Sequence, residues 1–188
     1  METSRTIFFI GKPGCGKGTQ AKILAEKTGW QIISAGNQFR AIAAEDTPIG
    51  HKIKLQMEAG GLAPHWFAMY LYLKSLFSVS ADTSVIFDGF NRKIHEAKLV
   101  VDSLKWLGRP FTIINIAISD DEVQRRLALR KNVESRADDN VVEERLKEYH
   151  EHTEPAIALF RDEGVLIEVN GEGSVEELAA AIRNVLGV

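Results

Sequence analysis

The sequence predicts an α/β fold of three layers, in which a five-stranded parallel sheet is flanked by helices on both faces. Strand and helix patterns alternate along the chain, as they do when parallel strands are joined by crossover helices. The expected strands are apolar on both faces, which is typical of strands buried between two layers. The 188 residues, 45% hydrophobic and 26% charged, suit one compact domain over 1–188.

Five short apolar runs are the expected strands. The first ends at a glycine, and each of the others lies beside a helical pattern. They cover residues 6–10, 30–33, 84–87, 111–118 and 165–169.

The expected helices have apolar residues at a spacing of three and four. Ser174 stands where it can cap the last one. They cover residues 17–28, 38–44, 49–59, 65–77, 94–107, 121–131, 141–161 and 175–186.

Two regions depart from simple alternation. Three helical patterns lie between the second and third strands, more chain than one crossover needs, so residues 35–64 are expected to form a mobile flap. Residues 130–140 form a charged, polar loop between two helices, which we interpret as a short lid.

A glycine-rich segment follows the first strand and opens the first helix, with the sequence Gly11-Lys12-Pro13-Gly14-Cys15-Gly16-Lys17. In this context backbone N–H groups and a helix N-terminus face a phosphate, and the lysine reaches the β and γ phosphates. The pattern predicts the three-layer fold of P-loop NTPases. The expected nucleotide-binding residues are Gly14, Cys15, Gly16, Lys17, Gly18 and Thr19.

Further motifs follow in a fixed order, and together they resemble the nucleoside monophosphate kinases of the adenylate kinase family, either adenylate kinases or uridylate-cytidylate kinases. Gly-Lys-Gly-Thr-Gln at 16–20 is similar to their phosphate loop. The other matching segments are 34–40, Gly-Leu-Ala-Pro at 61–64, Asp-Gly-Phe-Asn-Arg at 88–92, Ser-Arg-Ala-Asp-Asp at 135–139, 153–155 and 169–171.

The resemblance implies roles for six arginines. Arg40 and Arg92 would hold the acceptor phosphate, and Arg126 would lie against the ATP adenine. Such a cluster of cations suits phosphoryl transfer, which needs charge neutralisation more than covalent help. The implied catalytic residues are Lys17, Arg92, Arg126, Arg130, Arg136 and Arg145, with Arg126 and Arg130 also on the donor. The implied acceptor site is Ala35, Arg40, Gly89, Arg92, Glu96, Arg136 and Arg145, and Asp138 and Asp139 would orient the lid.

Asp88 ends the third strand beside the phosphate loop. From this position a carboxylate can hold Mg²⁺ through water, with ATP as the phosphoryl donor. No general base is expected, because the acceptor phosphate is already largely ionised at neutral pH. The five histidines show no metal-ligand spacing and are expected to lie on the surface or between helices.

Four positions differ from the family's usual residues. Ala35 stands where adenylate kinases usually have Thr and pyrimidine kinases have Ala, and Glu96 stands where they have Gln or Asn to read the base. A carboxylate only accepts hydrogen bonds, so it suits the two adjacent donors of guanine better than adenine. Asn91 replaces a proline, and Arg136 and Arg145 are two residues closer than usual.

The expected function is transfer of the γ-phosphoryl group of ATP to AMP. The alternatives are CMP, UMP or GMP as the acceptor, or a catalytically weakened nucleotide-binding protein of the same fold. A net charge of −3 argues against a nucleic-acid partner, and no apolar stretch is long enough for a membrane span. Cys15 is the single cysteine, so a reducing cytoplasm is the expected location, and we expect a monomer.

Overall fold

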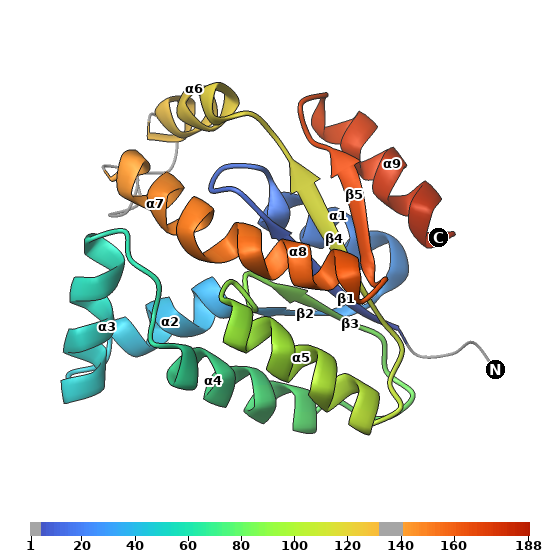
Figure 1. Ribbon diagram of the computed structural model, residues 1–188, viewed down its shortest axis with the longest axis horizontal. Helices are drawn as coiled ribbons and strands as arrows, with labels where there is room; N and C mark the ends of the chain where they lie inside the picture. Colours follow the sequence, from blue (N-terminus) through green and yellow to red (C-terminus); the bar gives the residue numbers. More distant parts are fainter. Residues whose placement is uncertain (1–4, 132–140) are drawn as a thin grey trace.

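The computed structural model describes residues 5–131 and 141–188. Its five strands form one parallel sheet in the order β2-β3-β1-β4-β5, which confirms the predicted α/β fold (Figure 1). The strands are β1 (Thr6–Gly11), β2 (Gln31–Ser34), β3 (Val85–Asp88), β4 (Phe111–Ala117) and β5 (Leu166–Asn170).

Helices cover both faces of the sheet. In Figure 1, α8 crosses in front of the strands and α1 lies behind them. The helical segments are α1 (Lys17–Thr28), α2 (Ala35–Ala43), α3 (Pro48–Glu58), α4 (His65–Phe77), α5 (Ile94–Trp106), α6 (Asp120–Lys131), α7 (Val142–Glu148), the π-helix η2 (Tyr149–Thr153), α8 (Glu154–Asp162) and α9 (Val175–Leu186).

Alternate side chains of β1 enter two different hydrophobic cores. Phe8 and Ile10 pack in the core formed with α4, α5 and α8, where Phe8 stacks on Phe87 of β3 with ring centroids 4.9 Å apart. Ile7 and Phe9 pack in the opposite core, with side chains of α1, α6 and α9. Because successive side chains of a strand point to opposite faces, β1 is anchored in both cores. This anchoring fixes the C-terminal end of the strand, where the phosphate loop begins.

Two helices differ from their predicted bounds by more than one residue. Helix α2 begins at Ala35, because the Ser34 side chain accepts a hydrogen bond from the backbone N–H of Asn37 and caps it. The predicted helix over 141–161 is divided by the π-turn of η2. Pro155 lies in the first turn of α8, and since it has no N–H it cannot complete the α-helical bond to the preceding turn.

The segment predicted as an acceptor flap, 35–64, contains α2, α3 and the connection to α4. Helix α3 lies at the margin of the molecule in Figure 1. Of the predicted lid, 132–140 lie outside the described residues, so the mobility of both insertions remains a prediction. No helix in the described ranges has both the length and the apolar character needed to cross a membrane.

Candidate active site

The phosphate loop connects β1 to α1 at the C-terminal edge of the sheet. It begins at Gly11, whose φ of 141° is open mainly to glycine, and a Cβ there would lie 2.6 Å from the backbone oxygen of Ile116. The Cys15 N–H donates to the Lys12 oxygen at 3.3 Å and closes the turn. The sequence therefore needs glycine where the start of the loop lies against Ile116 of β4.

The Lys17 ammonium lies in the middle of this loop. It donates to the backbone oxygens of Gly11 and Lys12, both at 2.8 Å, and lies 3.4 Å from the Cys15 sulfur. Burial lowers the pKa of Lys17, and the cation of Arg92 adds to this effect, while Cys15 and Asp88 oppose it. The loop therefore holds a half-buried lysine side chain against two of its own backbone oxygen atoms.

A second turn follows β3 and faces the phosphate loop. The Arg92 Nε donates to the Gly89 oxygen at 3.0 Å, and a Cβ at Gly89, whose φ is 81°, would lie 2.9 Å from an Arg92 nitrogen. Between them, Asn91 is fully buried with a φ of 58°, and both polar atoms of its side chain lack a hydrogen-bond partner among the described residues. The turn that directs Arg92 into the site therefore contains an asparagine, Asn91, with a left-handed backbone and a buried amide that lacks a partner among the described residues.

The two turns line one cavity of about 760 Å³, together with α2, α3, α6 and α7. Arg40 extends from α2 into its wall, and one of its nitrogens donates to Asn37 Oδ1 at 2.6 Å. Most of the predicted site residues meet here. They are Gly14, Gly16, Lys17, Gly18, Thr19, Ala35, Arg40, Asp88, Gly89, Arg92, Glu96, Arg126 and Arg145.

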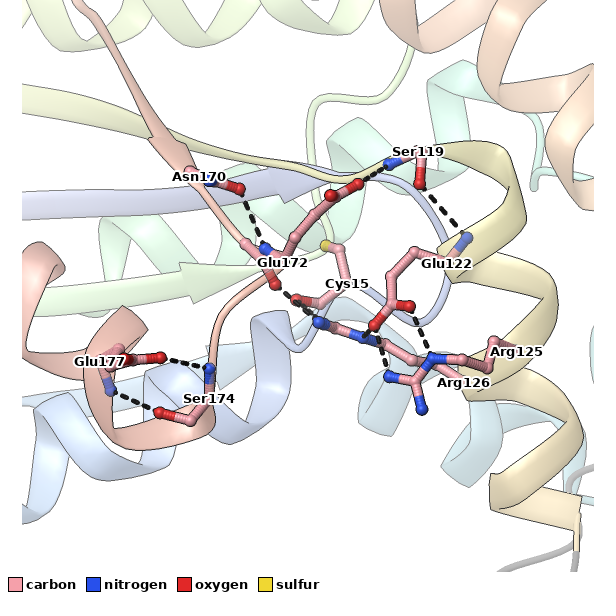
Figure 2. A network of polar contacts seen from close by, with 10 residues as sticks. Cys15, Ser119, Glu122, Arg125, Arg126, Asn170, Glu172, Ser174 and Glu177 are labelled. Atoms are coloured by element: carbon pink, nitrogen blue, oxygen red, sulfur yellow. Dashed lines mark hydrogen bonds and ion pairs between the residues drawn. The ribbon is translucent and has the colours of Figure 1, made fainter.

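Arg126 of α6 is held by three acceptors (Figure 2). It donates to Glu122 Oε1 at 2.6 Å, to the Gly171 oxygen at 2.7 Å and to the Cys15 oxygen at 3.5 Å. Hydrogen bonds from Arg125 and Arg126 lower the pKa of Glu122 to about 2. The guanidinium plane therefore joins α6 to the phosphate loop and to the connection between β5 and α9.

That connection is itself fixed by polar contacts, also drawn in Figure 2. Glu172 accepts from the Ser119 N–H at 2.8 Å, and the Glu172 N–H donates to Asn170 Oδ1 at 3.0 Å. Ser174 caps α9, as predicted, by accepting from the Glu177 N–H. Beside Arg126, a second hollow of about 480 Å³ lies between this connection and the phosphate loop.

Glu96 combines a cavity position with a local structural role that sequence reasoning missed. Its Oε2 accepts from the backbone N–H groups of Arg92 at 2.7 Å and Lys93 at 3.1 Å, and so caps α5. Among the described residues no donor contacts Oε1. Burial raises the pKa of Glu96, although both backbone hydrogen bonds oppose the shift. The side chain is only 3% exposed, so one carboxylate oxygen remains for a ligand in the cavity.

The residues around Asp88 fit a magnesium ion bound with a nucleotide. Asp88 Oδ2 lies 3.5 Å from the Ser34 hydroxyl and 3.5 Å from where a Cβ would stand at Gly18. The described residues contain no cluster of three or more acidic, histidine or cysteine side chains suited to a metal. Mg²⁺ commonly takes one or two carboxylates and completes its shell with phosphate oxygens and water, so a single carboxylate here is sufficient.

Four predicted residues are not placed by the described structure. Arg136, Asp138 and Asp139 lie outside the described residues. For Arg130 the structure describes the backbone in α6 but not the side chain. Their expected roles remain predictions. Cys15 is buried and contributes its backbone to the loop, while its side chain does not line the cavity.

Sequence reasoning also missed a polar cluster beside the phosphate loop. Asp120 contacts both Lys12 and His150, although the three residues are far apart in sequence. The charged character of Lys12 was the available signal, but no local pattern showed which partners the fold would bring to it.

Fold and site together define a P-loop nucleotide-binding protein whose cavity is lined with cations from several elements. A sequence profile described as "Adenylate kinase" matches residues 9–165. An adenylate kinase of Thermus thermophilus is 36% identical over the whole of both chains. Those of Leptospira biflexa and Maricaulis maris are each 35% identical, covering 95% and 94% of this chain and 97% and 95% of the relative. The chain belongs to the adenylate kinase family.

Proposed function

We propose that this protein transfers the γ-phosphoryl group of ATP to AMP and forms two molecules of ADP. The observation that carries the proposal is that one cavity is lined by Lys17 of the phosphate loop, Arg126 of α6, Arg40 of α2 and Arg92 of the turn after β3. Phosphoryl transfer requires that two phosphate groups meet while their negative charge is neutralised. A cavity lined by cations from four segments meets that requirement.

The donor nucleotide binds along the phosphate loop. The backbone N–H groups at the start of α1 accommodate its phosphates, and Lys17 exchanges carbonyl oxygens for phosphate oxygens. The adenine of ATP occupies the hollow of about 480 Å³ beside Arg126. The three acceptors that hold Arg126 keep its plane in place and so limit the entropy lost when a base packs against it.

The acceptor phosphate binds between Arg40 and Arg92, whose planar forks match phosphate oxygens. Arg130, Arg136 and Arg145 neutralise the charge on the group in transfer, and Asp138 and Asp139 orient the lid arginines. No side chain needs to remove a proton from the acceptor phosphate, since its second pKa is about 6.

In this proposal Asp88 would hold Mg²⁺ through water, and a bound ion would neutralise charge on the donor phosphates. Gly18 supplies no hydroxyl at the position next to Lys17, which leaves the Asp88 carboxylate as the protein's contribution there.

A pyrimidine acceptor is the second candidate, because Ala35 lines the cavity where the family's adenylate kinases usually have a threonine. The Glu96 geometry narrows the choice of base. Since Oε2 already accepts two backbone hydrogen bonds, Oε1 is left to accept from one amino group, such as that of adenine or cytosine. Two adjacent donors, as in guanine, suit a single oxygen less well.

A panel of monophosphates tests both candidates. ATP, Mg²⁺ and AMP, CMP, UMP or GMP are incubated with the protein, and ADP formation is measured for each. The highest specificity constant is expected for AMP. A higher value for CMP supports the second candidate, and no ADP with any monophosphate refutes phosphoryl transfer altogether.

We further infer that the protein works as a monomer in a reducing cytoplasm, without nucleic-acid or membrane partners. The net charge of −3 and a buried single cysteine support this inference. Light scattering of the purified protein would measure its mass directly.

A further inference from the structure

A chain of polar contacts links the phosphate loop to two distant segments. Lys12 Nζ lies 2.5 Å from Asp120 Oδ1, and Asp120 Oδ2 lies 3.1 Å from His150 Nε2. His150 Nδ1 in turn lies 2.9 Å from Glu154 Oε1. Lys12 Nζ also lies 5.8 Å from the centre of the Tyr149 ring. We call Lys12, Asp120, His150 and Glu154 the Lys12–Glu154 network.

The network joins three of the segments that carry cationic side chains of the cavity: the phosphate loop, α6 and the α7–η2 helix. The backbone oxygen of Lys12 accepts a hydrogen bond from the Lys17 ammonium. Asp120 is the first residue of α6, the helix of Arg126. His150 lies in η2, which continues directly from α7, the helix of Arg145. A displacement of any one segment therefore stretches a contact of the network.

The side chains of the network are well placed to hold one geometry. Lys12 is 15% exposed, so its ammonium has little water to replace Asp120. Tyr149, next to His150, lines the main cavity, and its ring presents an edge or face to both Lys12 and the imidazole. The π-turn ahead of Pro155 places these two residues there, and such turns within α-helices often occur at functional sites.

Both ring nitrogens of His150 face carboxylates. A carboxylate oxygen only accepts, so both nitrogens must donate if both contacts are hydrogen bonds, and only the charged imidazolium has two N–H groups. Neutral His150 would present a lone pair to either Asp120 or Glu154. The two contacts therefore exist together only in the protonated state.

We propose that the Lys12–Glu154 network is a positioning device, which holds the phosphate loop in register with the arginine-bearing helices during phosphoryl transfer, and that protonation of His150 completes it. The proposal rests on the proposed function. His150 is a positioning residue here, because it acts through Asp120 and Lys12 rather than by touching a substrate.

The charges that face His150 determine the pH range of the network. They are Asp120 on α6, Glu154 on α8 and, behind Asp120, Lys12 of the loop, with the Tyr149 ring alongside. Partial burial disfavours the imidazolium, but the two carboxylates outweigh burial and raise the pKa of His150. The Lys12 ammonium beside it lowers the pKa of Asp120. The network is thus intact above the lowered pKa of Asp120 and is lost as pH rises through the raised pKa of His150.

The test is the pH profile of the transfer step, measured by rapid quench with saturating ATP, Mg²⁺ and AMP. Wild-type protein is expected to lose about two- to fivefold in transfer rate between pH 6 and 8.5, the scale of one partly exposed ion pair. His150→Gln has no titrating ring, so its rate is expected to be lower at pH 6 than that of wild type. Its transfer rate is expected to change less between pH 6 and 8.5 than that of wild type.

His152→Gln is the matched control, since His152 lies in the same π-helix and pairs with Glu148 at 3.7 Å outside the network. It is expected to keep the wild-type profile. Lys12→Met is the second variant, and a double-mutant cycle with His150→Gln is expected to show coupling, because both act through Asp120.

Two outcomes overturn the proposal. If His150→Gln keeps the pH profile and rate of wild type, with at most a lower melting temperature, the network only stabilises the fold. If the effects of Lys12→Met and His150→Gln are additive, the residues do not act as one unit. Active wild-type protein in the same assay separates these results from a failure of the proposed function, which would leave the wild type without ADP formation.

Discussion

Replacing Glu96 with glutamine changes one group of a buried side chain and tests the base pocket directly. In the present geometry Oε2 caps α5, and Oε1 is the atom left for the base. The glutamine oxygen keeps the cap, while its NH₂ group takes the place of Oε1. If the amino group of adenine binds there, the amide NH₂ group faces a second donor, and the hydrogen bond that Oε1 accepts is lost.

The size of the effect follows from the burial of this group. A buried donor without a partner costs on the order of 1 to 3 kcal/mol, and Glu96 is 3% exposed. Because about 1.4 kcal/mol is a factor of ten, the specificity constant for AMP should fall about tenfold in Glu96→Gln. The Michaelis constant for ATP should not change, since the phosphate loop is untouched.

The assay is steady-state ADP formation across the four monophosphates, with Glu148→Gln as a control because Glu148 lines the same cavity. The control should leave the preference for AMP unchanged. If Glu96→Gln alters the specificity constant of no monophosphate, then the side chain does not face the base. That result would refute the assignment of the acceptor pocket at this wall.

Three further predictions concern the same site. Lys17→Ala should keep the melting temperature within a few degrees but lower turnover by orders of magnitude, because it removes a cation that follows the moving phosphoryl group; near-normal turnover contradicts this role. Gly89→Ala should raise the Michaelis constant for the monophosphate more than that for ATP, because φ is 81° and the new Cβ would displace Arg92; equal changes for both substrates would argue against it. The raised pKa of Glu96 means that its contribution to stability is complete below pH 4.5 and lost as pH rises through the raised value. Denaturant titrations should therefore show a smaller fall in the free energy of unfolding from pH 4.5 to 7 in Glu96→Gln than in wild type, and identical slopes would exclude the effect.

The sequence predicted those parts of the fold that depend on local pattern. Apolar runs such as that of β1 are buried on both faces, and the phosphate loop needs glycine at Gly11 because the backbone of Ile116 in β4 lies too close for a Cβ. The motif order also indicated which residues would line one cavity, as Lys17, Arg40 and Arg92 do. In each case neighbouring residues in the chain carry the physical constraint.

Some of the features that the sequence did not predict depend on contacts between distant parts of the chain. Others depend on which hydrogen-bond partner a side chain takes within the fold. Lys12 and His150 both contact Asp120 only because the fold brings the start of α6 and η2 to the phosphate loop. Glu96 was predicted to read a base, and nothing in the sequence indicated that one of its oxygens already caps α5. The buried amide of Asn91 likewise follows from the turn that contains it rather than from its neighbours.

The strand order has a consequence for how the protein is made. Strand β1 leaves the ribosome first, yet its two neighbours in the sheet are β3, which begins at Val85, and β4, which begins at Phe111. Parallel pairing over such long separations forms late, since the intervening chain must be closed into a loop beforehand. During synthesis the strand that precedes the phosphate loop therefore waits as an unpaired apolar segment, and it is the natural site at which a chaperone would hold the nascent chain.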